Sequence, residues 1–121
     1  MKYNLLISNH VVGSYRQRVR EDKLRDQRSD EEIKIMVEQA FLHCQHPKHF
    51  RKNMHLAVYF RDLFSGQVFH PFYHLVVFPE EDEFFGRSLK EKTLVAITIK
   101  YPLEVLLNKK INYSRKRSWF N

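Results

Sequence analysis

The sequence predicts an α+β domain in which N-terminal helices pack on one face of an antiparallel β-meander. Residues with helical periodicity come first, over 10–45, and three runs with strand character follow over 56–101. Hydrophobic residues make up 43% of the 121 residues, which is enough for one hydrophobic core. This length suits a single domain, so we expect one at 1–108, followed by a basic and aromatic tail at 109–121.

The first segment, 2–8, is a strand or the lead-in to a helix. A helix is predicted over 10–25, because apolar residues recur there at four-residue steps and form a narrow stripe. The stripe consists of Val11, Tyr15 and Val19. We expect this helix to fray by Asp22 and to pass into a charged connector of both signs at 21–28.

A second helix has the clearest local signals in the chain. Ser29 and Glu32 form a capping box that also places acidic residues in the first turn. The helix should end near Gln45, since Pro47 disfavours helical geometry at the residue before it. Cys44 lies on the apolar face, so we interpret it as a buried thiol. The other residues of that face are Ile33, Met36, Val37, Ala40 and Phe41.

Three strands are predicted after the helices. They are 56–61 (LAVYFR), 69–78 (FHPFYHLVVF) and 93–101 (TLVAITIKY). The second is apolar on both faces, which predicts a central strand. Ser65 and Gly66 suit a turn before it, and an acidic loop at 79–88 follows it, which we interpret as a solvated turn. Pro102 can begin a short last helix through Leu107.

The charge of the chain points to an anionic partner. Lys and Arg number 21 against 14 Asp and Glu, so the formal charge is +7. Such a domain attracts nucleic acid, acidic proteins or anionic membranes, although the charge can also serve solubility alone. One cysteine excludes an internal disulfide and fits the reducing cytoplasm. No apolar run is long enough for a signal peptide or a membrane span, so we expect no membrane partner.

One candidate catalytic group lies on the first predicted helix. His10, Ser14 and Arg18 follow at four-residue steps and should share a face, with Arg16 and Arg20 alongside. A histidine can exchange protons near neutral pH, and arginines can hold phosphate and stabilise the charge of a transition state. These are the groups of a metal-independent ribonuclease. The alternative is a solvated basic helix without catalysis.

The segments SNHVVGSYRQRVRE and SDEEIKIMVEQAF resemble the opening of small RelE-like ribonuclease toxins and of the phage RegB group. The segments LAVYFRD, YHLVVF and TLVAITIKYP resemble the meander of the wider barnase–EndoU–colicin–RelE grouping, so the resemblance spans about 7–102. It implies helices packed on an antiparallel sheet and ribonuclease activity. The relatives often carry Arg four residues after the histidine, where this chain has Ser14.

Under this resemblance, His10 is the general base or acid, and Arg16 and Arg18 clamp the scissile phosphate. His70 and His74, which should lie on one face of the second strand, are candidates for the partner acid or base. Their structural alternative is a histidine at a strand end or hydrogen-bonded in the core.

Two further groups contain ligand-like residues. The cluster of His43, Cys44, His46, His49 and His55 has metal-binding residue types but no paired knuckles, so we favour a core thiol beside exposed histidines and leave zinc open as the alternative. The tail mixes cations with rings, as suits single-stranded nucleic acid. Its candidate binding residues are Lys109, Lys110, Arg115, Lys116, Arg117 and Trp119, to which Arg20 is added from the first helix.

Together these observations predict an RNA-binding protein that acts as a metal-independent, toxin-like endoribonuclease without a cofactor. A protein partner, such as an antitoxin or a nucleoprotein target, stays open. The alternative is a non-catalytic phage or mobile-element protein that binds nucleic acid or a nucleoprotein complex and inhibits host defence. The positive charge alone does not show whether the nucleic-acid partner is RNA or DNA.

Overall fold

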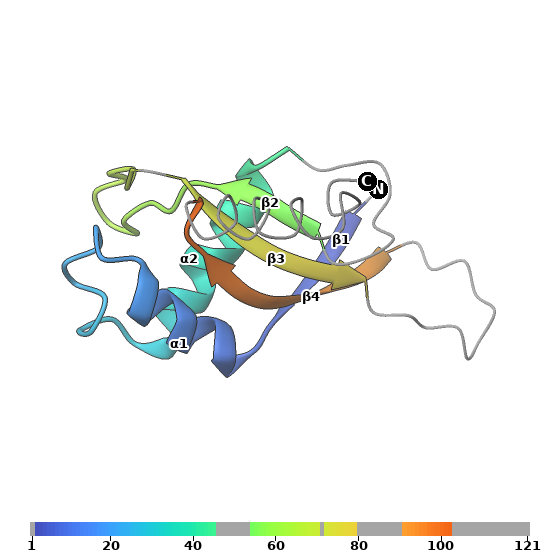
Figure 1. Cartoon of the computed structure of the whole chain (residues 1–121), viewed down its shortest axis with the longest axis horizontal. Helices are drawn as coiled ribbons and strands as arrows, with labels where there is room; N and C mark the ends of the chain where they lie inside the picture. The colour runs from blue at the N-terminus through green and yellow to red at the C-terminus, as the bar shows by residue number, and fades with distance from the viewer. Residues whose placement is uncertain (1, 46–53, 71, 80–90, 103–121) are drawn as a thin grey trace, which may run out of the picture.

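The computed structural model describes residues 2–45, 54–70, 72–79 and 91–102 (Figure 1). Within those residues the chain forms two helices and one four-stranded sheet. The elements are, in chain order, β1 (Lys2–Ile7), α1 (Asn9–Arg18), α2 (Asp30–His43), β2 (Met54–Val58), β3 (Tyr73–Pro79) and β4 (Glu91–Lys100). The predicted α+β class, with two N-terminal helices packed on a sheet, is confirmed.

The sheet is mixed, in the strand order β1-β4-β3-β2. β2, β3 and β4 pair antiparallel, but β1 pairs parallel to β4, from Lys2 opposite Glu91 to Ile7 opposite Ala96. The prediction of a pure antiparallel meander is therefore wrong, although a strand at 2–8 is confirmed. The long β4 would otherwise expose a row of unpaired backbone groups, and β1 covers the first part of that edge.

α1 is shorter than predicted, because it ends at Arg18 rather than near 25. Val19 leaves helical geometry with φ −86° and ψ 72°, yet its side chain stays fully buried in the core. Residues 20–28 then form turns around a buried ion pair between Asp22 and Arg28. Because this ion pair is buried, the connector at 20–28 packs against the protein and α1 does not continue beyond Arg18.

α2 follows its sequence signals closely. The Ser29 hydroxyl accepts a hydrogen bond from the Glu32 backbone N–H at 3.1 Å, which confirms the cap. The helix ends at His43, and Cys44 is a half-buried C-cap that packs against the core. All five other residues of the predicted apolar face are buried.

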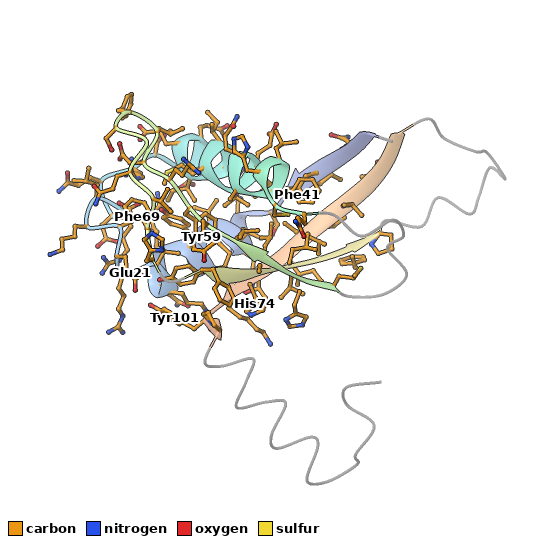
Figure 2. The ribbon with its side chains drawn as sticks, turned by 90° about the horizontal axis from the view of Figure 1, so that it is seen from above. Glu21, Phe41, Tyr59, Phe69, His74 and Tyr101 are labelled. Carbon is orange, nitrogen blue, oxygen red and sulfur yellow. The ribbon has the colours of Figure 1, made fainter. Side chains whose placement is uncertain are left out.

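Alternate side chains of the strands pack against the helices and form the core. These buried strand residues are Leu56, Val58, Tyr73, Leu75, Val77, Leu94, Ala96 and Ile99. Figure 2 shows α2 on one side of the sheet, with Phe41 at the junction and His74 on the opposite side. β3 lies between β4 and β2, as predicted for a central strand.

The strand ends differ from the predicted ones. β2 stops at Val58, and Arg61 takes part only in an isolated bridge to Val68, which closes the predicted turn. Gly66 in that turn has φ +73°, a conformation that favours glycine. The acidic loop, the last helix beyond Pro102 and the tail fall outside the described residues. No helix of the described part is long and apolar enough to cross a bilayer.

Candidate functional site

A shallow hollow of about 170 Å³ lies between α1 and the end of β4. We call it the α1–β4 hollow, and its described lining residues are His10, Gly13, Ser14, Gln17, Arg18 and Thr98. The structure thus brings His10, Ser14 and Arg18 together, as their four-residue spacing predicts. His10 and Gln17 are exposed and Arg18 is half-buried, so a histidine and an arginine border one small opening.

Ser14 joins α1 to β4. β1 ends opposite Ala96, and among the described residues no other strand pairs with β4 beyond that point on the same side. There the buried Ser14 hydroxyl accepts a hydrogen bond from the Ile99 N–H at 3.1 Å and lies 3.0 Å from the Ile99 carbonyl and 2.9 Å from the Thr98 hydroxyl. A serine hydroxyl can satisfy both backbone groups of Ile99. Ser14 therefore has a structural role in joining α1 to β4.

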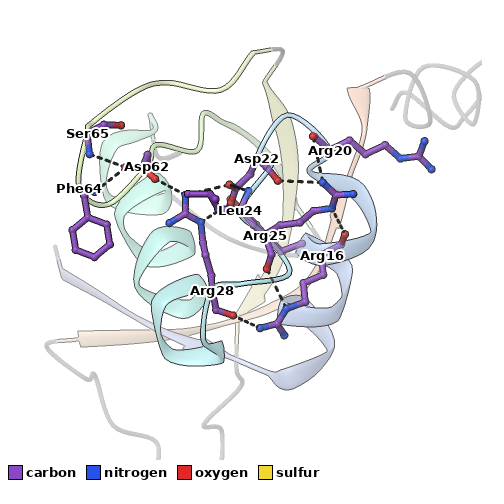
Figure 3. Close-up of polar contacts among 10 residues, drawn as sticks. Arg16, Arg20, Asp22, Leu24, Arg25, Arg28, Asp62, Phe64 and Ser65 are labelled. Atoms are coloured by element: carbon purple, nitrogen blue, oxygen red, sulfur yellow. Dashed lines mark hydrogen bonds and ion pairs between the residues drawn. The ribbon is translucent and has the colours of Figure 1, made fainter.

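Arg16 is not among the described lining residues of the α1–β4 hollow, and its side chain points toward the connector (Figure 3). Its guanidinium forms an ion pair with Asp30 at 2.6 Å and donates to the Arg28 carbonyl at 2.7 Å. These contacts fasten α1 to the start of α2. Arg20 is exposed in the turn after α1, where Figure 3 shows its side chain pointing outward. Of the three arginines predicted near His10, Arg18 is the one that lines the hollow among the described residues.

A buried charge network, which sequence reasoning missed, supports this end of the molecule (Figure 3). Arg28 donates to Asp22 at 2.7 and 3.1 Å and to Asp62 at 2.5 Å. Tyr15 on α1 donates to the same Asp22 at 2.6 Å. We call these four residues the Arg28 network. The neighbouring sequence does not predict the Arg28 network, because Asp62 lies 34 positions from Arg28. In addition, a segment with charges of both signs is usually a solvated connector.

The network also sets the ionisation of its members. Burial, reinforced by the hydrogen bond to Asp22, raises the pKa of Tyr15 well above its ordinary value. The backbone N–H of Ser65, together with the Arg28 guanidinium, holds the pKa of Asp62 well below its usual range. On the other side of the core, burial and a hydrogen bond to Glu21 raise the pKa of Tyr73. The two phenols therefore stay neutral and the Asp62 carboxylate stays charged near neutral pH.

His70 and His74 lie on the outer face of the sheet, away from the hollow's described lining. The His74 ring contacts Phe72 and His55, with centroid distances of 5.4 and 5.9 Å. Tyr59 contacts His70 at 5.4 Å and Phe72 at 6.1 Å. The two histidines therefore belong to one continuous line of rings. Sequence reasoning placed His55 only in the histidine and cysteine cluster and did not select Tyr59, although residues four positions apart on a strand point to the same face.

The histidine and cysteine cluster is described only in part. His43 is exposed at the end of α2, and burial raises the pKa of the half-buried Cys44 thiol. His46 and His49 lie outside the described residues, as do all the tail residues predicted to bind nucleic acid. Within the described ranges, no three His, Cys, Asp or Glu side chains are grouped so that they could hold a metal ion.

The comparisons with known proteins identify no relative. No family model, curated protein or solved structure matches this chain. What the described residues show is a small α+β fold with two helices and a mixed four-stranded sheet. A fold class is common to many functions, so arguments about function rest on the site itself.

Proposed function

We propose that the chain binds RNA at the α1–β4 hollow and cleaves it without a metal ion, as the RelE-like resemblance implies. One observation carries this proposal: His10 and Arg18 border the same small opening, between α1 and the end of β4. The formal charge of +7 attracts a phosphate backbone to the protein as a whole. A proton carrier and a fixed cation at one place are the groups that RNA cleavage requires.

The reaction uses the neighbouring 2′-hydroxyl of the RNA as the nucleophile. Its oxygen bonds to phosphorus, the bond from phosphorus to the 5′-oxygen breaks, and the products carry a 2′,3′-cyclic phosphate and a 5′-hydroxyl. His10 removes the proton of the 2′-hydroxyl, since its imidazole is the one imidazole among the described lining residues. Arg18 faces the phosphate oxygens as negative charge develops on them. Water returns a proton to the leaving 5′-oxygen.

Ser14 and Arg16 have supporting roles in this proposal. Ser14 fixes α1 to β4, and so holds the two walls of the hollow at a constant separation. Arg16 ties the end of α1 to Asp30 and to the connector, which positions the helix that carries His10 and Arg18. Neither residue is required to touch the RNA.

The test is incubation of labelled single-stranded RNA with the purified protein in EDTA, read on a denaturing gel. We expect cleavage by the wild type and a loss on the order of 10²- to 10⁴-fold in His10→Ala, the usual contribution of a proton-transfer group. The matched control is His43→Ala, which removes an exposed histidine from the end of α2 and should cleave normally. Equal cleavage by His10→Ala and His43→Ala contradicts the proposal.

A second candidate is binding without cleavage, as in an inhibitor that covers nucleic acid or a nucleoprotein complex. The observation that favours it is the separation of the histidines, because His70 and His74 lie on the sheet face rather than in the hollow. Intact RNA in EDTA, combined with a gel shift that weakens as salt rises, would support this candidate instead.

A further inference from the structure

We propose that the outer face of β2 and β3 is a stacking surface for the unpaired bases of single-stranded RNA that enters the α1–β4 hollow. We call this surface the ring row, and it consists of His55, Tyr59, His70, Phe72 and His74. The inference rests on the proposed function and names the class of RNA that the site takes.

The ring row is continuous. From His70 through Tyr59, Phe72 and His74 to His55, successive ring centroids are 5.4, 6.1, 5.4 and 5.9 Å apart. The members alternate along the chain with residues that point into the core, such as Val58 and Tyr73. The line therefore crosses from β2 to β3, with His55 and His74 on the strands and the other three members in the segments that adjoin them. Figure 2 labels Tyr59 and His74, and Tyr59 also lines a pocket at the edge of the sheet with residues of α2.

The chemistry of the ring row suits bases better than an apolar protein partner. Tyr59 is 46% exposed, and His55 and His70 are exposed as well. Four of the five rings carry a polar atom, so the surface combines flat π-faces with hydrogen-bonding groups. Every base offers a π-face, and stacking on such rings tolerates any sequence. None of the five rings is an aliphatic side chain; the exposed aliphatic side chains of the described residues lie on α2 (Ile35 and Leu42), on β1 (Leu6) and in the connector (Leu24), and Ile35 borders the same pocket as Tyr59.

Cations flank the row and connect it with the hollow. Lys100 pairs with His74 across β3 and β4, and Thr98, two residues before Lys100, lines the hollow. The exposed Arg61 follows Tyr59 by two residues and lines the same pocket. A strand of RNA whose phosphate lies at Arg18 can therefore continue across the end of β4 onto the rings, with Lys100 opposite His74 and Arg61 close to Tyr59.

The test measures binding of a short, labelled, single-stranded RNA with 2′-O-methyl groups, which cannot be cleaved, by fluorescence anisotropy. Because the stacking of one base on one ring contributes to the binding free energy, Tyr59→Ala should weaken the binding of this RNA by about 5- to 150-fold. Tyr59→Phe keeps the ring and should bind normally. The matched control is Phe64→Ala, which removes an aromatic ring that is 86% exposed in the turn after β2 and lies outside the row. Circular dichroism verifies that each variant is folded.

The outcomes separate this inference from the proposed function. Cleavage of unmodified RNA in EDTA is measured alongside, and Phe64→Ala should cleave it as the wild type does. If Tyr59→Ala binds the 2′-O-methyl RNA as well as Phe64→Ala does, the ring row is not a base-binding surface, even where His10-dependent cleavage is present. If the wild type binds no single-stranded RNA, the inference and the proposed function are both overturned.

Discussion

Arg28 pairs with two carboxylates in the interior of the protein, and its removal is expected to cost much of the folding free energy. Its side chain is 3% exposed, and the side chains of Asp22 and Asp62 are 1% and 13% exposed. Arg28→Met keeps most of the apolar volume but leaves both carboxylates without their cation. Breaking a buried ion pair by deleting one partner costs about 3–5 kcal/mol. A domain has about 5–15 kcal/mol of stability in total.

The assay is urea unfolding followed by circular dichroism. With a slope of about 1–3 kcal/mol per molar urea, a loss of this size lowers the midpoint by about 1 M or more. Arg20→Met is the matched control, because Arg20 is exposed in the same connector, and we expect a change within about 0.5 kcal/mol. The double variant Arg28→Met with Asp22→Asn should recover part of the loss, since it removes the more buried of the two uncompensated carboxylate charges.

A loss below about 1 kcal/mol in Arg28→Met would refute this reasoning, because exposed ion pairs have values of that size. Water would then reach the carboxylates, and the connector would not depend on the Arg28 network. A loss of several kcal/mol without recovery in the double variant would instead assign the stability to the packing of the arginine side chain.

Two other predictions concern hydroxyl groups of the core. Ser14→Ala removes the hydroxyl that bonds to the Ile99 backbone groups and should lower the unfolding free energy by about 1–3 kcal/mol. Gln17 is exposed in the same hollow, so Gln17→Ala should leave the unfolding free energy nearly unchanged, and equal effects of the two variants would contradict the role of Ser14. Tyr15 and Tyr73 have raised pKa values in the folded protein, so their neutral forms stabilise it below about pH 10 and this stability is lost as pH rises further. An alkaline titration of ultraviolet absorbance should show two of the six tyrosines ionising only on unfolding, and one uniform transition near the ordinary value would contradict this.

The parts of the fold that local sequence determines were predictable. Ser29 and Glu32 predict the start of α2, because a helix cap depends on two residues only three positions apart. The spacing of His10 and Arg18 predicts a shared opening, because helix geometry alone sets which side chains are neighbours. These predictions require no knowledge of the remainder of the chain.

What escaped prediction depends on residues far apart in the sequence. The parallel pairing of β1 joins Ile7 to Ala96, and an apolar run at the N-terminus does not specify its partner. Arg28 and Asp62 look like solvated charges until the fold encloses them together. Tyr59 becomes part of a row only when β2 and β3 pair in their observed register.

The central claim is RNA cleavage by His10 at the α1–β4 hollow, and one measurement tests it most directly. Labelled RNA and its 2′-O-methyl counterpart are each incubated in EDTA with the wild type, His10→Ala and His43→Ala. The account predicts that the wild type and His43→Ala convert the RNA to fragments with 2′,3′-cyclic phosphate ends, that His10→Ala does not, and that the 2′-O-methyl strand stays intact. Fragments that His10→Ala forms as fast as the wild type, or RNA that stays intact with all three proteins, would contradict it.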